Sequence, residues 1–302
     1  MTTNWQVVAG APTLPPLYWR AATRRKITGS VLPDDGLRAW LNVDAQAVAA
    51  YRKVCGFTEN GLLPPTYPHV LAFGLQLQLL TAQSFPFPLL GLVHLANRIR
   101  LLRPLGGLSR VQASVHVQNL QPHAKGATFD LITRLDDALG PLWEAESRML
   151  CKGVKLAGEP PEPLVQDPQD IDEVSRWWAP TEIGRQYARV SGDYNPIHLS
   201  ALSARLFGFP QVIAHGLWIK ARTLAALSGH LPSSNLEIAV QFNKPVRLPS
   251  EVILLASAAG SSGDLQLRGH RAPHNIHAHG PPRAGPPTHP GPEPPPPKPP
   301  PP

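Results

Sequence analysis

Apolar, proline and glycine positions recur in the same order in two long stretches of the chain, residues 44–156 and residues 172–270. In each stretch a helical pattern ends at a glycine, in YRKVCG at Gly56 and in YARVSG at Gly192. Further along, YPHVLAFGL from residue 67 matches FPQVIAHGL from residue 209. The shared order of elements predicts two copies of one structural unit.

An almost wholly apolar segment stands near the middle of each unit. In the second unit the segment runs from Gly216 to Gly229, and its apolar spacing suits a buried helix. In the first unit Leu75–Leu79 alternates with glutamine as a strand would, yet Leu75, Leu79 and Ala82 also fit one helix face. The repeat favours the helix, so we expect a central helix in both units.

Segments rich in β-forming residues and bounded by turns follow each predicted central helix. They are residues 89–100, 111–120, 126–137 and 142–152 in the first unit, and 236–242, 251–259, 264–268 and 274–279 in the second. The last of these is weak, because Ile276 is its one large apolar residue. Four strands after one helix predict the α+β class, with an antiparallel sheet wrapped around a helix in each unit.

The 302 residues allow two domains of ordinary size. We expect a first domain at residues 1–156, a proline-rich linker at 157–169, a second domain at 170–280 and a tail at 281–302. Of the 22 residues in the tail, 14 are proline, which cannot donate the hydrogen bonds of a sheet. The sequence therefore leaves open whether residues 274–279 complete the second sheet.

The densest polar pattern is the run Gly192-Asp193-Tyr194-Asn195-Pro196-Ile197-His198. Thr181 is expected to cap the helix before it, and Ser200 to cap a short helix after it. The run is then a tight loop that presents a carboxylate and an imidazole five residues apart. Such a pair can hold one water molecule, remove its proton and return a proton to a substrate. A plain turn with an unreactive histidine is the alternative for Asp193 and His198 taken alone.

The N-terminus of the predicted helix at Gly216 adds a second chemical feature. Backbone N–H groups at a helix start have no partner within the helix, and the helix dipole places positive charge there. A buried helix start with a glycine can therefore stabilise a thioester oxygen that becomes an enolate. This group complements the loop at Asp193.

These residues carry a resemblance to a known family. Gly192-Asp193-x-Asn195-Pro196-Ile197-His198, followed by Phe209-Pro210 and Ala214-His215-Gly216, is similar to the signature of the MaoC-like (R)-specific enoyl-thioester hydratases and (3R)-hydroxyacyl-thioester dehydratases. The layout resembles their double hot-dog members. The resemblance implies that Asp193 and His198 activate water, that the Gly216 N–H lies in the oxyanion hole, and that Asn195 helps hold the loop. Asn195 and His215 are expected to bind the substrate. The resemblance implies no metal or redox cofactor.

The first unit differs from the second at the matching positions. Phe57 stands opposite Asp193, Leu62 opposite His198 and Phe73 opposite His215. The first unit is therefore predicted to keep the frame without the polar chemistry. We expect Phe57 and Phe73 to line a pocket for the acyl chain of the substrate.

Composition and charge restrict the remaining possibilities. The net charge of +7 comes partly from Arg24-Arg25-Lys26 and from Arg98, Arg100, Arg103 and Arg110, without a nucleic-acid motif. These clusters suit either a solvated surface or the phosphates of coenzyme A or an acidic acyl-carrier protein. Cys55 and Cys151 have no metal-type spacing and are expected to be buried thiols.

The opening residues lack a secretory signal, and the apolar runs are too short to span a membrane, so we expect a cytoplasmic protein. The function expected is reversible hydration of trans-2-enoyl thioesters in fatty-acid metabolism. A non-catalytic hot-dog subunit that binds acyl thioesters is the alternative. Each chain would form a pseudo-dimer, with a homodimer possible, and the sequence leaves open the acyl length and the direction of the reaction.

Overall fold

In the computed structural model, residues 3–159, 171–257, 262–269 and 272–279 are described. Most of the predicted linker and the whole proline-rich tail lie outside these ranges, so the proposed domain boundaries stay predictions. The described strands are β1 (Asn4–Val7), β2 (Asp35–Asn42), β3 (Val93–Leu101), β4 (Arg110–His123), β5 (Gly126–Asp137), β6 (Gly140–Lys152), β7 (Ile171–Ala179), β8 (Leu236–Gln241), β9 (Ser250–Ser257), β10 (Ser262–Gly269) and β11 (Ala272–His279).

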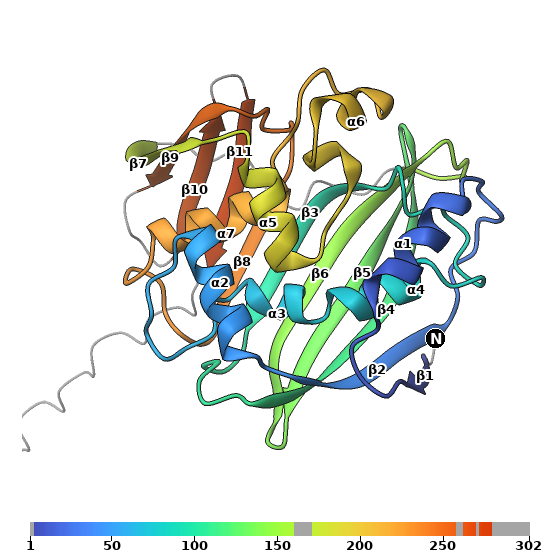
Figure 1. Cartoon of the computed structure of the whole chain (residues 1–302), viewed down its shortest axis with the longest axis horizontal. Coiled ribbons are helices and arrows are strands. Elements are labelled where there is room, and N and C mark those ends of the chain that lie inside the picture. Colours follow the sequence, from blue (N-terminus) through green and yellow to red (C-terminus); the bar gives the residue numbers. More distant parts are fainter. Residues whose placement is uncertain (1–2, 160–170, 258–261, 270–271, 280–302) are drawn as a thin grey trace, which may run out of the picture.

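One continuous sheet joins both halves, and β3 and β8 pair at its centre in antiparallel fashion. Outward from this seam the first half runs β3-β6-β5-β4-β2-β1 and the second half runs β8-β11-β10-β9-β7. Apart from the extra parallel strand β1, the two halves therefore have the same strand order, which confirms the predicted repeat (Figure 1).

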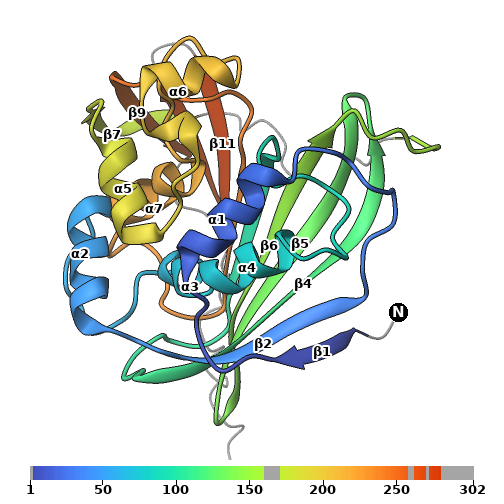
Figure 2. The same ribbon diagram turned by 45° about the vertical axis from the view of Figure 1, so that its right-hand side comes forward.

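The helices lie over the same side of the sheet in both views, α4 in front of β4 and β5, and α7 against the second half (Figure 2). They are α1 (Leu14–Thr23), α2 (Ala45–Cys55), α3 (Tyr67–Leu71), α4 (Phe73–Leu80), α5 (Ile183–Ser191), α6 (Ala201–Leu206) and α7 (Gly216–Ala226), with a 3-10 turn at Pro196–His198. Each half thus wraps a sheet around a central helix, and the α+β double hot-dog architecture is confirmed.

The two halves also meet through equivalent helices. Helix α2 packs on α5, and the rings of Tyr51 and Tyr187, which the repeat aligns, have centroids 6.1 Å apart. Both rings are buried. A contact between equivalent residues is expected where the two copies face each other across a local pseudo-two-fold axis.

Most of the local signals in the sequence are confirmed. Asp44 caps α2 by accepting from two backbone N–H groups, and Ser200 caps α6. Gly56 and Gly192 end their helices in the left-handed conformation. The predicted cap at Thr181 is wrong, because α5 begins one residue later with Glu182 at its N-cap and without a side-chain capping bond.

The sequence analysis missed several elements of the structure, among them strand β1, which pairs with β2. Strand β2 flanks β4 and leads into α2, and strand β7 flanks β9 and leads into α5. Helix α1, which begins with Leu14-Pro15-Pro16, was also missed. The weak closing strand is present: β11 lies between β8 and β10, with Ile276 opposite Val240.

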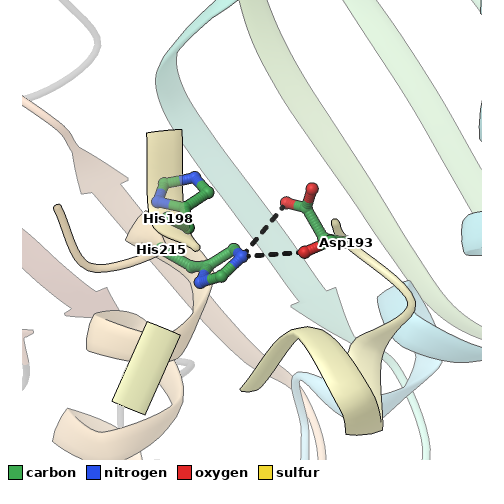
Figure 3. Close-up of side chains that lie close together, drawn as sticks. All are labelled: Asp193, His198 and His215. Carbon is green, nitrogen blue, oxygen red and sulfur yellow. Dashed lines mark hydrogen bonds and ion pairs between the residues drawn. The ribbon is translucent and has the colours of Figure 1, made fainter. Parts of the chain in front are cut away.

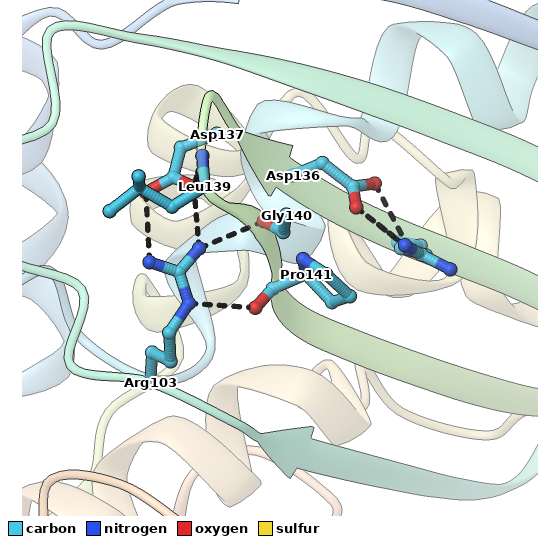
Figure 4. A network of polar contacts seen from close by, with 7 residues as sticks. Arg103, Asp136, Asp137, Leu139, Gly140 and Pro141 are labelled. Atoms are coloured by element: carbon cyan, nitrogen blue, oxygen red, sulfur yellow. Dashed lines mark hydrogen bonds and ion pairs between the residues drawn. The ribbon is translucent and has the colours of Figure 1, made fainter.

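Several arginines that could have formed a free basic face are instead paired. Arg98 and Arg100 both contact the carboxylate of Glu237 across the central seam. Arg103 binds the carboxylate of Asp137 and the carbonyls of Gly140 and Pro141, and so fastens the β5–β6 turn (Figure 4). The arginines of β3 and the following loop therefore hold the sheet together.

None of the helices in the described ranges is long and apolar enough to cross a membrane.

Candidate active site

A cavity of about 860 Å³ lies between the two halves and is lined by both. The first half contributes Phe73, Leu77 and Leu80 from α4, together with residues of β3 and β6. The second half contributes the loop from Asp193 to His198 and the start of α7 at Gly216. The sequence motif therefore faces a cavity that neither half forms alone.

The loop begins where α5 ends. Gly192 has a φ of +78°, and a Cβ atom there would lie 2.7 Å from Leu14 Cδ1 of helix α1. The Asp193 carboxylate accepts the Asn195 N–H at 3.1 Å, and the Asn195 side chain accepts the Ile197 N–H at 3.4 Å. Asn195 thus holds the loop in its turn and also lines the cavity.

The surroundings of His198 determine both its tautomer and its charge. Its Nδ1 lies 2.7 Å from the carbonyl oxygen of Ile213, so Nδ1 must carry the proton, and Nε2 has the free lone pair. Burial lowers the pKa of His198, against the opposing effects of Asp193 and the Ile213 carbonyl. The imidazole is therefore neutral near pH 7, with Nε2 able to accept a proton.

His215 lies directly beneath this pair (Figure 3). Its ring stacks on His198 with centroids 3.7 Å apart, and its Nε2–H donates to the backbone carbonyl of Asp193 at 3.0 Å. The same nitrogen is 3.8 Å from Asp193 Oδ2. Burial lowers the pKa of His215 well below its usual value. As a neutral donor, His215 positions Asp193, and its predicted contact with substrate stays a prediction.

Gly216 opens the buried helix α7, as the sequence predicts. A Cβ atom at this position would lie 2.8 Å from the ring of Phe242. Only glycine fits without moving that ring, so the backbone at the helix start stays close to the cavity. The first N–H groups of α7 have no partner within the helix and can receive a thioester oxygen.

The three polar side chains also have the spacing of a metal site. Ligand atoms of Asp193, His198 and His215 lie within 4.8 Å of one another. His215 Nε2 already donates to a carbonyl, and His215 Nδ1 is buried away from hydrogen-bond partners, whereas Asp193 and His198 retain free lone pairs. The geometry suits a water molecule between Asp193 and His198, and a chelator test separates this from a metal centre.

The first half corrects two expectations. Phe73 lines the cavity, but Phe57 is not among its lining residues and instead stacks on Tyr51 with centroids 6.5 Å apart. Leu62 forms an isolated bridge to Gly106. The first half also contributes polar side chains to the cavity, which was not expected. They are His69, Gln76, His94 and Ser147. The alignment missed them because they do not occupy the positions that match the second motif.

Tyr18 of helix α1 is a further residue that the sequence did not reveal. Its hydroxyl donates to the Gly192 carbonyl at 2.7 Å and accepts the Tyr194 N–H at 2.8 Å. These two peptide groups flank Asp193. The sequence around Leu14-Pro15-Pro16 has no local pattern from which a contact between this helix and the loop could be predicted, because Tyr18 and Gly192 are 174 residues apart.

Comparison with known proteins agrees with this geometry. A family model described as "MaoC like domain" matches residues 162–267. A 3-hydroxyacyl-thioester dehydratase X from Mycobacterium tuberculosis is 34% identical over 229 residues, which cover 76% of this chain and 81% of the relative. The chain therefore belongs to the family of MaoC-like dehydratases.

Solved structures support the same assignment. The crystal structure of HtdX from M. tuberculosis has a TM-score of 0.71 and 31% identity, and covers 81% of this chain and 99% of that one. A MaoC-like dehydratase from Phytophthora capsici has a TM-score of 0.68 at 20% identity, over 84% of this chain and 97% of that one, and shows the shared fold. A mitochondrial 3-hydroxyacyl-[acyl-carrier-protein] dehydratase from Arabidopsis thaliana is 32% identical over 75 residues, 24% of this chain and 45% of the relative.

Proposed function

We propose that this protein is a hydro-lyase that reversibly adds water to trans-2-enoyl thioesters and gives (3R)-hydroxyacyl thioesters. The observation that carries the proposal is the pair Asp193 and His198, two proton acceptors on one loop that faces the shared cavity. Membership of the MaoC-like family and the likeness to a named 3-hydroxyacyl-thioester dehydratase support it.

In the hydration direction, Asp193 and the Nε2 atom of His198 hold one water between them. The water oxygen bonds to C3 of the enoyl chain as one of its protons passes to the pair. The C2=C3 electrons move towards the thioester oxygen, which the Gly216 N–H at the start of α7 stabilises as an enolate. The pair then returns a proton to C2 from the same face, so that H and OH are added overall.

The carrier of the acyl chain is proposed from the charges around the cavity. Arg25, Lys125, Lys152 and Lys244 are exposed and also line it, and they come from both halves. Such a set suits the phosphate of the phosphopantetheine arm, which coenzyme A and acyl-carrier proteins share. We therefore assign phosphate binding to these four residues, and not to the arginines of β3, which are paired with carboxylates.

A non-catalytic acyl-binding scaffold was the alternative if the last strand of the second half were missing. The backbone of β11 pairs on both sides, and the loop, the histidines and α7 are in place, which favours catalysis. A cytoplasmic location and a homodimer stay predictions from the sequence.

The direct test follows the loss of enoyl absorbance with trans-2-enoyl thioesters of coenzyme A and of an acyl-carrier protein. We expect (3R)-hydroxyacyl product with at least one carrier, and unchanged turnover after treatment with a chelator. Lys125→Glu and Lys152→Glu should raise KM more than they lower kcat. Loss of activity on chelation and its return with metal would overturn the metal-free mechanism, and inactivity on every chain length and carrier would overturn the hydratase assignment.

A further inference from the structure

The part of the cavity wall that the first half forms contains a second polar cluster, made up of His69, Gln76 and His94. His69 is 8% exposed and Gln76 is 3% exposed, yet both line the cavity. Their neighbours along the same wall are apolar, among them Leu77, Leu80, Leu131 and Met149. Burying polar groups is unfavourable unless they are paired. Three polar side chains in this wall are therefore not expected if the cavity binds only an unsubstituted hydrocarbon chain.

The hydrogen bonds of the cluster define what it offers to a ligand. Gln76 Nε2 lies 2.8 Å from Thr133 Oγ1 and 3.3 Å from His69 Nδ1. An amide nitrogen is a donor, so His69 Nδ1 accepts and its proton is on Nε2. His94 Nε2 is buried and has no hydrogen-bond partner. The cluster therefore holds an imidazole donor and a nitrogen that still needs a partner.

The charge state restricts the kind of ligand. Burial lowers the pKa of His69 to about 3 and that of His94 to about 4. The neighbouring His94 and, to a smaller extent, Lys220 also lower the pKa of His69, while Asp193 raises it. Lys220, which donates to Asn97 and to the carbonyl of Ile238, adds to the effect of burial on His94. Near pH 7 both imidazoles are neutral, and neutral groups suit an uncharged oxygen better than a carboxylate.

We propose that His69 and His94, with Gln76 orienting the His69 ring, bind a hydroxyl or carbonyl oxygen carried by the acyl chain beyond C3, so that oxygenated acyl thioesters are the preferred substrate class. This inference rests on the proposed function, which places the thioester at Gly216 and C3 at Asp193 in the second half. The chain must then continue along the wall formed by α3, α4 and β3. Asp193 and His69 line the same cavity, so one bound chain can meet both the proposed water-activating pair and the cluster.

An unsubstituted chain would fit this wall less well. When it displaces water, it leaves the polar atoms of the cluster without partners, and sites built to hydrogen-bond a substrate oxygen discriminate against analogues that lack it. An oxygen at the matching carbon would satisfy them. Affinity should therefore depend on the position of the oxygen along the chain.

The experiment measures binding of saturated acyl-CoA thioesters by calorimetry, because these cannot be hydrated. Octanoyl-CoA is compared with its 5-, 6- and 7-hydroxy and 5-, 6- and 7-oxo derivatives. We expect at least one oxygenated chain to bind roughly 10-fold more tightly than octanoyl-CoA. His94→Phe and Gln76→Leu should each bring this ratio close to one, while Leu77→Met, a change of shape on the same wall, should preserve it.

Thermal melting of each variant verifies that it is folded, and the comparison of chains on the unaltered protein requires no variant. The proposal is overturned if no oxygenated chain binds better than octanoyl-CoA, or if the ratio survives in both folded polar-to-apolar variants. The hydration assay is separate: a binding preference without any turnover would contradict the proposed function and leave the polar cluster as a ligand site.

Discussion

The hydroxyl oxygen of Tyr18 lies 2.7 Å from the carbonyl oxygen of Gly192, although the two residues are 174 positions apart. The same hydroxyl accepts the N–H of Tyr194 at 2.8 Å, so one side chain of α1 holds the peptide groups on both sides of Asp193. Burial raises the pKa of Tyr18, which keeps the hydroxyl protonated and able to donate. Helix α1, which precedes β2 in the first half, therefore holds the proposed catalytic loop of the second half.

Tyr18→Phe removes both hydrogen bonds and keeps the ring that packs edge-on against Tyr194. We expect kcat to fall by about 10-fold with little change in KM, because small misplacements of a reacting group are costly to the rate. Trp19→Phe, a change at an exposed position on the same helix, is the control. Equal kcat values for the two variants would show that the loop holds itself without Tyr18.

Asp193→Asn and His198→Gln remove the two proposed proton-transferring groups. Each should lower kcat by about 10²–10⁴-fold, the usual contribution of general acid–base catalysis. Binding of a saturated acyl-CoA should survive, because neither change fills the cavity. Near-full kcat in either variant would be incompatible with the assigned pair.

Because several buried histidines are neutral in the folded protein, the free energy of unfolding is expected to depend on pH. The folded pKa of His69 is about 3, and that of His215 is well below its usual value, whereas the unfolded chain has values near 6.5. Below about pH 6.5 the unfolded state therefore binds protons that the folded state does not, and stability falls as the pH falls towards the folded values.

At pH 5 we expect His69 alone to lower the unfolding free energy by about 2 kcal/mol relative to pH 7.5. Urea unfolding at the two pH values measures the change, and His69→Asn should reduce it. His230→Gln, at an exposed histidine after α7, is the matched control and should leave it unaltered. Equal or greater stability at pH 5 would show that these histidines are not held neutral.

Gly184 allows α5 to pack against the backbone of the loop. A Cβ atom there would lie 2.1 Å from the carbonyl oxygen of His198, so Gly184→Ala must displace the loop or the helix. We expect a loss of roughly 1–3 kcal/mol in stability, as for overpacked cores, together with reduced kcat. Gly10→Ala, where no atom lies within 4 Å of the new Cβ, should change neither in thermal melting and turnover assays.

The end of the chain can be tested by truncation. A chain that stops before His270 loses β11, which pairs with both β8 and β10, and should aggregate because two inner strand edges are exposed. A chain that stops before Pro281 retains every described strand, and its stability should change within roughly ±0.5 kcal/mol. Identical melting temperatures and solubility of the two truncations would exclude a structural role for β11.

Much of this protein was readable from local sequence. The caps at Asp44 and Ser200 and the glycine stops at Gly56 and Gly192 depend on hydrogen bonds and backbone angles within a few residues. The repeat supplied what single elements could not. It identified the ambiguous Leu75–Leu79 segment as a helix, because that segment has a stronger equivalent in the other half. For residues 274–279 the repeat gave only a place for a closing strand, and the structure showed that β11 fills it.

Only the tertiary structure decided the contacts that join distant segments. The Ile213 carbonyl selects the tautomer of His198, His215 and Tyr18 hold the backbone around Asp193, and Phe57 lies away from the cavity. These outcomes depend on which surfaces meet when the two halves and α1 pack together. A local pattern predicts the element on which a side chain lies, whereas its partners and its protonation state follow from burial and neighbours that only the folded chain supplies.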